Sequence, residues 1–205
     1  MTRNIRGRDD RLTSELEADF LLMAYAHGYF PMADPRSGKI SWYSPDPRAI
    51  IPFTTYRPPR SLRRVVEKHV FDVRFDTAFQ QVIRGCSHRH DTWISDEFVR
   101  AYVDLHALGH AHSVETWKDE VLAGGLYGVT LGGAFFGESM FSLVPNASKV
   151  AFVHLVERLR SNGFVLLDTQ FLNDHVMQFG AYEISRQEYL VLLGNATRTQ
   201  AKFTL

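Results

Sequence analysis

The order of sequence patterns in the second half of the chain predicts an α+β fold, in which a mixed sheet is covered by helices. Three alternating apolar segments follow one another, with turn-forming residues between them, as is typical of three consecutive strands. A helix, an apolar strand, a short helix, a strand and a last helix complete the order. The longer patterns cover residues 112–117, 121–131, 134–142, 148–161, 164–169 and 182–184.

The N-terminal region begins with polar residues, after which Ser14-Glu15-Leu16-Glu17 matches a helix capping box. The helix that follows is expected to end at Gly28. Its predicted inner face consists of Leu16, Phe20, Met23, Ala24 and His27. Residues 29–59 are rich in Pro, Asp and Ser, and we expect loop there with one short strand at 49–51.

The middle of the chain is expected to alternate short helices and strands. A helix after Pro59 places Leu62 and two valines inward, and a strand follows over residues 70–75. Asp76 is a candidate cap for the next helix, and Ser95 for a helix closed by Gly109. Near the C-terminus, Ser185 and Glu188 match a second capping box.

Composition predicts a soluble intracellular protein. The 205 residues are 45% apolar, which suffices for a substantial core, and the formal net charge is zero. Cys86 is the single cysteine, which fits a reducing compartment. The first thirty residues lack a signal-peptide core, and no stretch approaches the roughly 18 apolar residues of a membrane span. Contact with nucleic acid would therefore need a local basic patch.

Metal-binding and nucleophilic sites are not favoured by the motifs. Residues 86–91 and the pair His110 and His112 collect ligand types, but neither set has a recognised zinc spacing. Solvated loop histidines and an ordinary strand pair explain them better. Cys86 is expected to be a packed small residue, and phosphate-binding glycine loops are absent from the sequence.

Two carboxylates stand out because they fall in apolar strands. Glu138 lies between Phe135-Phe136 and Met140-Phe141, and Asp168 ends the run 164–167, with Gln170 two residues on. A buried carboxylate needs a partner or a function. If the strand continues, Asp168 and Gln170 share a face. A purely structural hydrogen-bond network remains an equal alternative.

A basic helix face is the second candidate site. Arg60, Arg63, Arg64 and Lys68 fall on the side opposite the valines. In a neutral protein this concentration fits a phosphate contact, although a solvated helix face is commoner. Loop aromatics such as Trp42 and Trp93 have the chemistry to stack on bases, although aromatics also serve as core.

Several longer motifs resemble the leucyl/phenylalanyl-tRNA–protein transferase family, and the similarity runs from about Leu21 to Leu190. They include Ala24-Tyr25-Ala26-His27-Gly28-Tyr29-Phe30-Pro31, Trp42-Tyr43-Ser44-Pro45-Asp46-Pro47-Arg48, Thr92-Trp93-Ile94, Gly109-His110-Ala111-His112-Ser113-Val114-Glu115, Gly124-Gly125-Leu126-Tyr127-Gly128-Val129, Phe136-Gly137-Glu138-Ser139-Met140-Phe141-Ser142, Asn146-Ala147-Ser148-Lys149, Leu167-Asp168-Thr169-Gln170 and Asn173-Asp174-His175.

The resemblance implies a small N-terminal domain at residues 1–59 and a GNAT-like catalytic domain at 60–205, in a cytoplasmic monomer with neither metal nor organic cofactor. It implies transfer of Leu, Phe and less efficiently Met from aminoacyl-tRNA to proteins that begin with Arg or Lys. Such transfer marks the acceptor for degradation in the bacterial N-end rule pathway.

The resemblance also assigns site residues. Asp168 and Gln170 take the catalytic positions, Trp93 stacks on the terminal adenosine, and Glu138 has a polar binding or orienting role. The donor side-chain pocket comprises Leu126, Phe135, Met140, Phe152, Leu159 and Leu167. Arg60, Arg63, Arg64 and Lys68 would contact the tRNA backbone.

Two positions depart from the family pattern. The usual Gly-rich segment before the first helix is replaced by Arg11-Leu12-Thr13-Ser14, and Met32 stands where relatives have a Trp. Met32 offers less flat area to the adenine. Two rivals remain: an acetyl-CoA-dependent N-acetyltransferase, for which the pyrophosphate loop is lacking, and a non-catalytic RNA-binding adapter.

Overall fold

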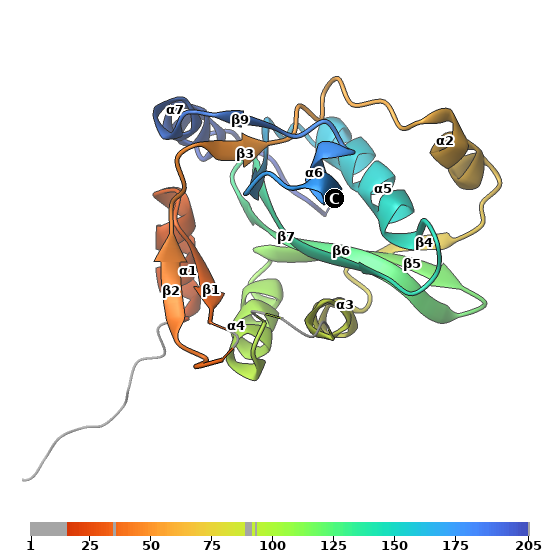
Figure 1. The fold of residues 1–205 in the computed structure, drawn as a ribbon, viewed down its shortest axis with the longest axis horizontal. Helices are drawn as coiled ribbons and strands as arrows, with labels where there is room; N and C mark the ends of the chain where they lie inside the picture. Colours follow the sequence, from red (N-terminus) through yellow and green to blue (C-terminus); the bar gives the residue numbers. More distant parts are fainter. Residues whose placement is uncertain (1–15, 35, 89–91, 93, 205) are drawn as a thin grey trace, which may run out of the picture.

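The computed structural model describes residues 16–34, 36–88, 92 and 94–204, and it confirms the predicted α+β fold with a mixed sheet (Figure 1). In this part of the chain, the main sheet has seven strands in the order β4-β5-β6-β7-β8-β3-β9. Neighbouring strands are antiparallel except β7 and β8, which pair in parallel. The strands are β3 (Arg48–Ile50), β4 (Asp72–Phe75), β5 (Ala111–Lys118), β6 (Val121–Leu131), β7 (Ala134–Ser142), β8 (Leu166–Gln170) and β9 (Tyr182–Ile184).

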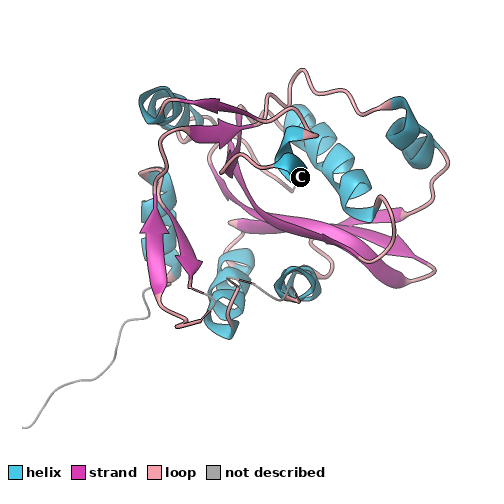
Figure 2. Cartoon of the chain, viewed as in Figure 1, coloured by secondary structure: helices cyan, strands magenta, loops and turns pink. Residues whose placement is uncertain are grey.

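Helices cover both faces of the sheet (Figure 2). On one face, α5 (Ala147–Ser161) packs against β5 and β6, and α2 (Arg60–Glu67) packs against α5. On the other face, α3 (Phe79–Ser87) lies against β6 and β7 beside α4 (Asp96–Ala107). Because α5 connects β7 to β8, it provides the long crossover that a parallel pair requires.

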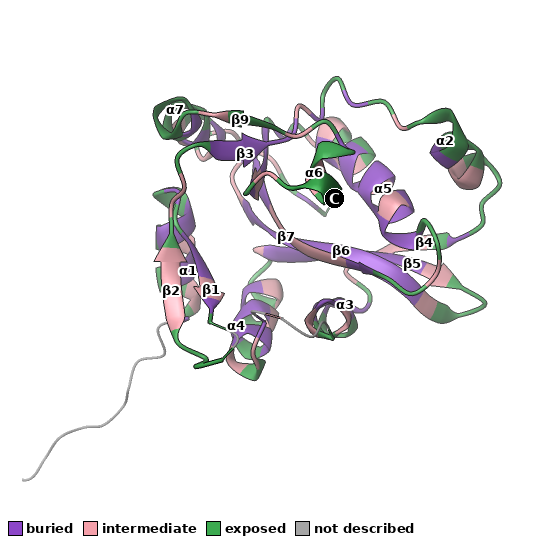
Figure 3. Cartoon of the chain, in the orientation of Figure 1, coloured by how far each residue is buried: buried purple, intermediate pink, exposed green. Residues whose placement is uncertain are grey.

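Side chains on the two faces of the sheet pack into two separate hydrophobic cores. Leu126 and Phe135 belong to the core that includes α5, whereas their neighbours Tyr127 and Phe136 belong to the core that includes α3 and α4. This division follows from the two-residue period of a strand. Figure 3 shows that β6 and the start of β7 are buried along most of their length. The sheet is therefore the central layer of the molecule.

The N-terminal part of the described chain forms a small unit beside the sheet. Helix α1 (Ala18–Ala26) packs against α4 and precedes an antiparallel hairpin of β1 (Phe30–Ala33) and β2 (Ile40–Tyr43). The prediction of loop was wrong for this hairpin, which buries Phe30 and Ala33. The predicted short strand near residue 50 is confirmed as β3, which joins the main sheet.

The predicted inner face of α1 is partly wrong. Phe20 and Met23 are 43% and 49% exposed, and His27 is exposed as well. Leu21 and Tyr25 are fully buried instead, together with the expected Leu16 and Ala24. A shift of one residue rotates a helix face by about 100°, so the pattern predicted the helix but not its orientation.

The predicted caps have different outcomes. Ser95 accepts a hydrogen bond from the Phe98 amide at the start of α4, and Ser185 with Glu188 forms the capping box of α7 (Arg186–Ala196), so both are confirmed. Ser14 lies outside the described residues. The Asp76 cap was wrong: α3 begins after Ala78. The Asp76 carboxylate instead accepts from the Ser113 amide and pairs with His112.

Within the described ranges, the structure has no helix that combines the length and the apolar character of a membrane span.

Candidate active site

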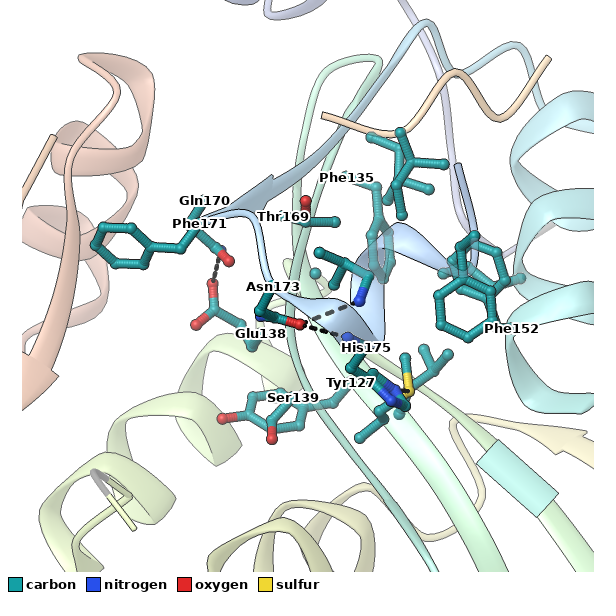
Figure 4. A pocket seen from close by; sticks show the side chains of 18 of the residues that line it. Tyr127, Phe135, Glu138, Ser139, Phe152, Thr169, Gln170, Phe171, Asn173 and His175 are labelled. Atoms are coloured by element: carbon teal, nitrogen blue, oxygen red, sulfur yellow. Dashed lines mark hydrogen bonds between the residues drawn. The ribbon is translucent and has the colours of Figure 1, made fainter. Parts of the chain in front are cut away.

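A cavity of about 520 Å³ lies between β7 and β8, and α5, α6 (Asp174–Met177) and β1 complete its walls (Figure 4). Its inner wall is apolar and includes Leu126, Phe135, Met140, Phe152, Leu155 and Leu167. Its polar groups come from Glu138, Ser139, Thr169, Gln170, Asn173 and His175. An apolar enclosure with a few grouped polar side chains is the usual form of a small-ligand site.

The cavity exists because β7 and β8 separate. They pair only where Ala134–Phe136 faces Leu166–Asp168. Directly afterwards β7 contains a bulge against β6: Gly137 pairs with Gly128, and Ser139 pairs with Tyr127, which leaves Glu138 as the extra residue. A bulge interrupts the ladder and redirects a side chain, here that of Glu138 into the cavity.

Glycine is required opposite the bulge. A Cβ atom at Gly128 would collide with the carbonyl oxygen of Phe136 and the ring of Phe135. Without that close approach the strand could not bring Glu138 to the cavity.

A buried cluster around Asp168 supports the cavity from behind. Arg48 donates to both carboxylate oxygens, from Nε to Oδ1 at 2.9 Å and from Nη2 to Oδ2 at 2.6 Å. Tyr189 donates to Oδ2 at 2.7 Å, and the Gln170 amide donates to Oδ1 at 2.9 Å. Arg48 Nη1 also donates to the Gly28 carbonyl at 3.0 Å. Arg48 and Asp168 are both 0% exposed, and Asp168 is not among the residues that line the cavity.

Gln170 connects this cluster to the cavity. Its backbone has a φ of 60°, in the left-handed region, and its amide is held by Asp168. Its side chain lines the cavity and donates to Glu138 Oε1 at 3.2 Å. Figure 4 shows the two side chains facing each other, joined by this hydrogen bond. Asp168 therefore has only an indirect link to the cavity: it holds the backbone of Gln170, whose side chain lines the cavity.

Glu138 is a carboxyl group whose environment in the cavity strongly alters its pKa. Burial raises its pKa to about 8, against the lowering effect of the hydrogen bond from Tyr25. The Tyr25 hydroxyl donates to Glu138 Oε1 at 2.6 Å and lies 2.6 Å from the Tyr102 hydroxyl. Burial also raises the pKa of both tyrosines well above the usual value, so both carry their protons at neutral pH. In the hydrogen bond between the Tyr25 and Tyr102 hydroxyls, either oxygen can be the donor.

The structure brings together most of the site residues that the sequence indicated. Glu138, Gln170 and Met32 line the cavity, as do Leu126, Phe135, Met140, Phe152 and Leu167. Leu159 is buried in the core around α5 but does not line the cavity. Trp93 lies outside the described residues.

The rim of the cavity is formed by the N-terminal hairpin and α6. Phe30 of β1 packs edge-on against Phe171 and stacks on Tyr43. On the other side, Asn173 caps α6 by accepting from the amides of His175 and Val176. A ligand in the cavity would thus contact both the N-terminal unit and the main sheet.

The basic residues predicted on α2 lie together at the surface. Arg60, Arg63, Arg64 and Lys68 are all exposed, while Leu62 is buried beneath them. We call these four residues the basic face of α2. The helix contacts α5, which also lines the cavity, so the basic face and the cavity share one supporting element.

The candidate ligand cluster at residues 86–91 lies partly outside the described residues. Among the residues that the structure describes, no group of three His, Cys, Asp or Glu side chains could hold a metal ion. His112 pairs with Asp76 at 2.8 Å and stacks on Phe203. Cys86 is buried on α3, as expected of a packed small residue.

Four functional-site residues were not predicted from the sequence: Arg48, Tyr189, Tyr25 and Tyr102. Arg48 and Tyr25 fall within motifs that carry the family resemblance, which gave a signal for their importance but none for their partners. Tyr102 and Tyr189 had no signal beyond helical periodicity. An arginine in a Pro-rich segment is ordinarily exposed, so its complete burial was not foreseeable.

Family models match nearly all of the chain. Residues 50–194 match the model described as leucyl/phenylalanyl-tRNA protein transferase, and residues 14–46 match the model of its N-terminal domain. The presence of a small N-terminal domain is thereby confirmed, while its predicted boundary at residue 59 stays a prediction.

Curated relatives agree with the family models. Proteins named leucyl/phenylalanyl-tRNA–protein transferase from Gloeobacter violaceus and Herpetosiphon aurantiacus are each 52% identical to this chain. The alignments cover 92% and 94% of this chain, and 97% and 100% of the relatives. Among solved structures, L-PGS from Bacillus licheniformis aligns with 88% of this chain and 70% of its own, at 12% identity and a TM-score of 0.43.

Proposed function

We propose, because this chain belongs to the leucyl/phenylalanyl-tRNA–protein transferase family and is a transferase, that it transfers Leu, Phe and less efficiently Met from aminoacyl-tRNA to acceptor proteins. The acceptors begin with Arg or Lys, the product is a new peptide bond, and the modified proteins enter N-end rule degradation. The enzyme acts as a monomer in the cytoplasm.

The observation that carries this proposal is the apolar cavity with amide and carboxyl groups at its edge. A donor side chain fits the wall formed by Leu126, Phe135 and Phe152, which offers no polar partner. Leu, Phe and Met are unbranched at Cβ, whereas Ile and Val place a methyl group against the strand. One misplaced methyl costs about 1–3 kcal/mol, which gives moderate selectivity.

The chemistry needs positioning more than strong catalysis. The donor is an ester and the product an amide, so the reaction is favourable and requires no cofactor. Holding an amine against the ester carbonyl contributes roughly 7–11 kcal/mol of barrier reduction. Gln170 is placed to hold the acceptor at the cavity, and Asp168 fixes the backbone of Gln170.

The tRNA contacts are assigned to two regions. The basic face of α2 binds phosphates, in keeping with its exposure and its lack of acidic partners among the salt bridges of the described residues. The terminal adenosine stacks on Trp93, and Met32 at the cavity edge supplies a softer second contact.

Incubation with charged tRNA and a peptide that begins with Arg tests the proposal directly. Mass spectrometry should show a gain of one Leu or Phe residue, and none on the same peptide with an acetylated N-terminus. Acetylation in the presence of acetyl-CoA would indicate an N-acetyltransferase instead. Binding of tRNA without any modification of the peptide would indicate an adapter.

A further inference from the structure

Asp168 is unsuited to accept the proton that the acceptor amine loses during transfer. A carboxylate offers about four lone-pair positions. In Asp168, four donors occupy these positions: Nε and Nη2 of Arg48, the hydroxyl of Tyr189, and the backbone N–H of Gln170. The side chain is also completely buried and does not reach the cavity. The proton must therefore go to another group.

We propose that Glu138 is the catalytic residue that accepts this proton from the α-amine of the acceptor. The inference rests on the proposed function, since it assigns a step within aminoacyl transfer. Glu138 is the one carboxyl group among the described residues that line the cavity. Its Oε1 accepts hydrogen bonds from the Gln170 side chain at 3.2 Å and from the Tyr25 hydroxyl at 2.6 Å.

The position of the Glu138 carboxyl group is set by the bulge in β7. Glu138 is the extra residue of the bulge in β7, and the bulge depends on Gly128 opposite it. The amide that we assign to hold the acceptor is the same Gln170 side chain that contacts Glu138. An amine held by Gln170 therefore lies within reach of the Glu138 carboxyl (Figure 4).

The proton affinities on the two sides are matched. A protein α-amine has a pKa of about 7.7–8.0, and burial raises the pKa of Glu138 to about 8. Glu138 is therefore a carboxylate over the same pH range in which the acceptor amine is neutral and can attack. The groups that face Glu138 are Tyr25 of α1, Tyr102 of α4, Tyr127 of β6, Arg48 of β3 and Asp168 of β8, with His175 of α6 across the cavity.

The amine nitrogen attacks the ester carbonyl carbon, a C–N bond forms, and the amine proton passes to the Glu138 carboxylate. The C–O bond to the ribose then breaks, and protonated Glu138 returns the proton to the leaving ribose oxygen. The products are an amide and a ribose hydroxyl, and Glu138 is again a carboxylate.

The main test compares wild type with Glu138→Gln in single-turnover transfer from Phe-tRNA to an arginyl peptide. Gln can still accept at Oε1 from Tyr25 and Gln170, so donor binding should stay within a few fold. The rate should fall by roughly 100-fold or more, the usual contribution of a general base. A Glu138→Gln rate within threefold of wild type would overturn the inference.

Chemical rescue separates proton transfer from a structural role. In Glu138→Ala, small carboxylates and imidazoles of increasing pKa should restore the rate, and the logarithm of the rescued rate should rise with that pKa. Rescue that does not depend on the pKa of the added base would contradict proton transfer and leave only a space-filling role.

Tyrosine variants provide a second route if the Glu138 variants do not fold. The Tyr25 hydrogen bond lowers the pKa of Glu138, so Tyr25→Phe should move the acidic limb of the pH–rate profile to higher pH. Tyr127→Phe is the matched control, because its buried hydroxyl has no hydrogen-bond partner. The aminooxy analogue of the arginyl peptide, neutral across the titration, removes the acceptor's own titration from the profile.

Each remaining outcome is decisive. A limb that stays fixed in Tyr25→Phe but disappears in His175→Gln would assign the proton to His175 and overturn the inference. A wild-type enzyme that transfers nothing from Leu- or Phe-tRNA would refute the proposed function itself. Normal wild-type transfer with an unaffected Glu138→Gln would refute only the role of Glu138.

Discussion

At the scale of single residues, the Arg48–Asp168 pair holds the site together. Both groups are fully buried, and the pair joins β3 to β8 while it also contacts Gly28 and Tyr189. Buried ion pairs are retained when every polar atom has a partner, and here the carboxylate is saturated. The ion pair in turn holds the backbone of Gln170 in the left-handed region, because Asp168 accepts from the Gln170 backbone amide. A residue other than glycine adopts this conformation only when its surroundings impose it.

The first prediction concerns this pair. Arg48→Met and Asp168→Asn should each destabilise the fold by about 3–5 kcal/mol, since each leaves a buried group without its partner. The double variant should lose at least about 1 kcal/mol less than the sum, because the two residues are directly coupled. Denaturant unfolding of all four proteins measures the coupling, and strictly additive losses would contradict it.

Transfer activity should follow the same pair. Asp168→Asn should slow turnover strongly while charged-tRNA binding changes only a few fold, because the buried carboxylate positions Gln170 and does not line the cavity. Near-normal turnover in a folded Asp168→Asn protein would remove Asp168 from the mechanism.

The second prediction concerns stability and pH. The pKa of Glu138 rises from an ordinary 4.5 to about 8 on folding, so the folded protein binds this proton more tightly than the unfolded chain. Stability is therefore greatest below pH 4.5 with respect to this group and is lost as pH rises toward 8. Each pKa unit corresponds to about 1.4 kcal/mol.

Glu138→Gln removes this titration. The melting temperature of the variant minus that of wild type should therefore be larger at pH 8 than at pH 5. Thermal melts at the two pH values measure it. Glu188, whose exposed carboxylate has a lowered pKa, supplies the control variant Glu188→Gln, which should show no such gain at pH 8. An equal difference between Glu138→Gln and wild type at both pH values would mean that Glu138 does not titrate in this range.

The sequence could indicate single unusual residues, but it could not indicate hydrogen-bond partners that lie far apart along the chain. Glu138 and Asp168 were identifiable because a carboxylate in an apolar strand is unusual on its own. Their partners were not: Arg48 and Asp168 are separated by 120 positions, and Tyr25 and Glu138 by 113. Only the sheet order, which inserts β3 next to β8, brings the first pair together.

At the scale of elements, the long patterns were reliable, whereas the short ones were only partly so: strands β3 and β9 were predicted, but the β1–β2 hairpin was not. Strands β5, β6 and β7 contain eight to eleven residues with clear alternation, and all three were predicted. The hairpin β1–β2 has four residues per strand and contains Pro31, so its pattern resembled loop. Its strands are ordered by pairing with each other and by packing of aromatic rings, neither of which is visible in local sequence.

The third prediction concerns the pocket between elements. Leu126 on β6 and Met140 on β7 are register partners on the cavity wall. Leu126→Trp should fill the cavity and reduce transfer of Phe more than that of Leu, and Met140→Ala should enlarge it and improve Phe relative to Leu. The choice between Arg and Lys at the acceptor should not change, since both positions line the apolar wall.

Leu159→Ala is the matched control for the pocket variants. Leu159 is fully buried on α5 but lies away from the cavity, so its loss should cost about 2–5 kcal/mol of stability without changing the Phe-to-Leu ratio. Competition assays with mixed Phe-tRNA and Leu-tRNA measure the ratio. A changed ratio in Leu159→Ala would place this residue in the donor pocket after all, as the family resemblance suggested.

At the scale of the whole molecule, charge is balanced but unevenly placed. The chain has 23 basic and 23 acidic residues, so no long-range field draws in nucleic acid. The basic face of α2 places four cations on about two helical turns, with Leu62 on the opposite side against the protein. Composition predicted that any phosphate contact must be local, and helical spacing predicted which residues form it. The exposure of all four came from the packing of α2 on α5.

The last prediction uses the salt dependence of tRNA binding. Each phosphate that a cation neutralises contributes roughly 0.7–0.9 to the slope of log affinity against log salt. Replacing Arg60, Arg63 and Arg64 together by Gln should therefore reduce the slope by about 2 to 3, because three contacts disappear. The control variant removes the same amount of charge elsewhere, by replacing three exposed arginines outside α2 with Gln: Arg36, Arg100 and Arg186. Filter binding of charged tRNA from low to moderate salt measures both slopes. If the two triple variants lose the same slope, net charge governs the attraction and the basic face of α2 is a solvated helix surface. A smaller slope in the α2 variant alone, with transfer to short aminoacyl-adenosine donors intact, places the tRNA backbone on this helix and separates tRNA docking from the chemistry at Glu138 and Gln170.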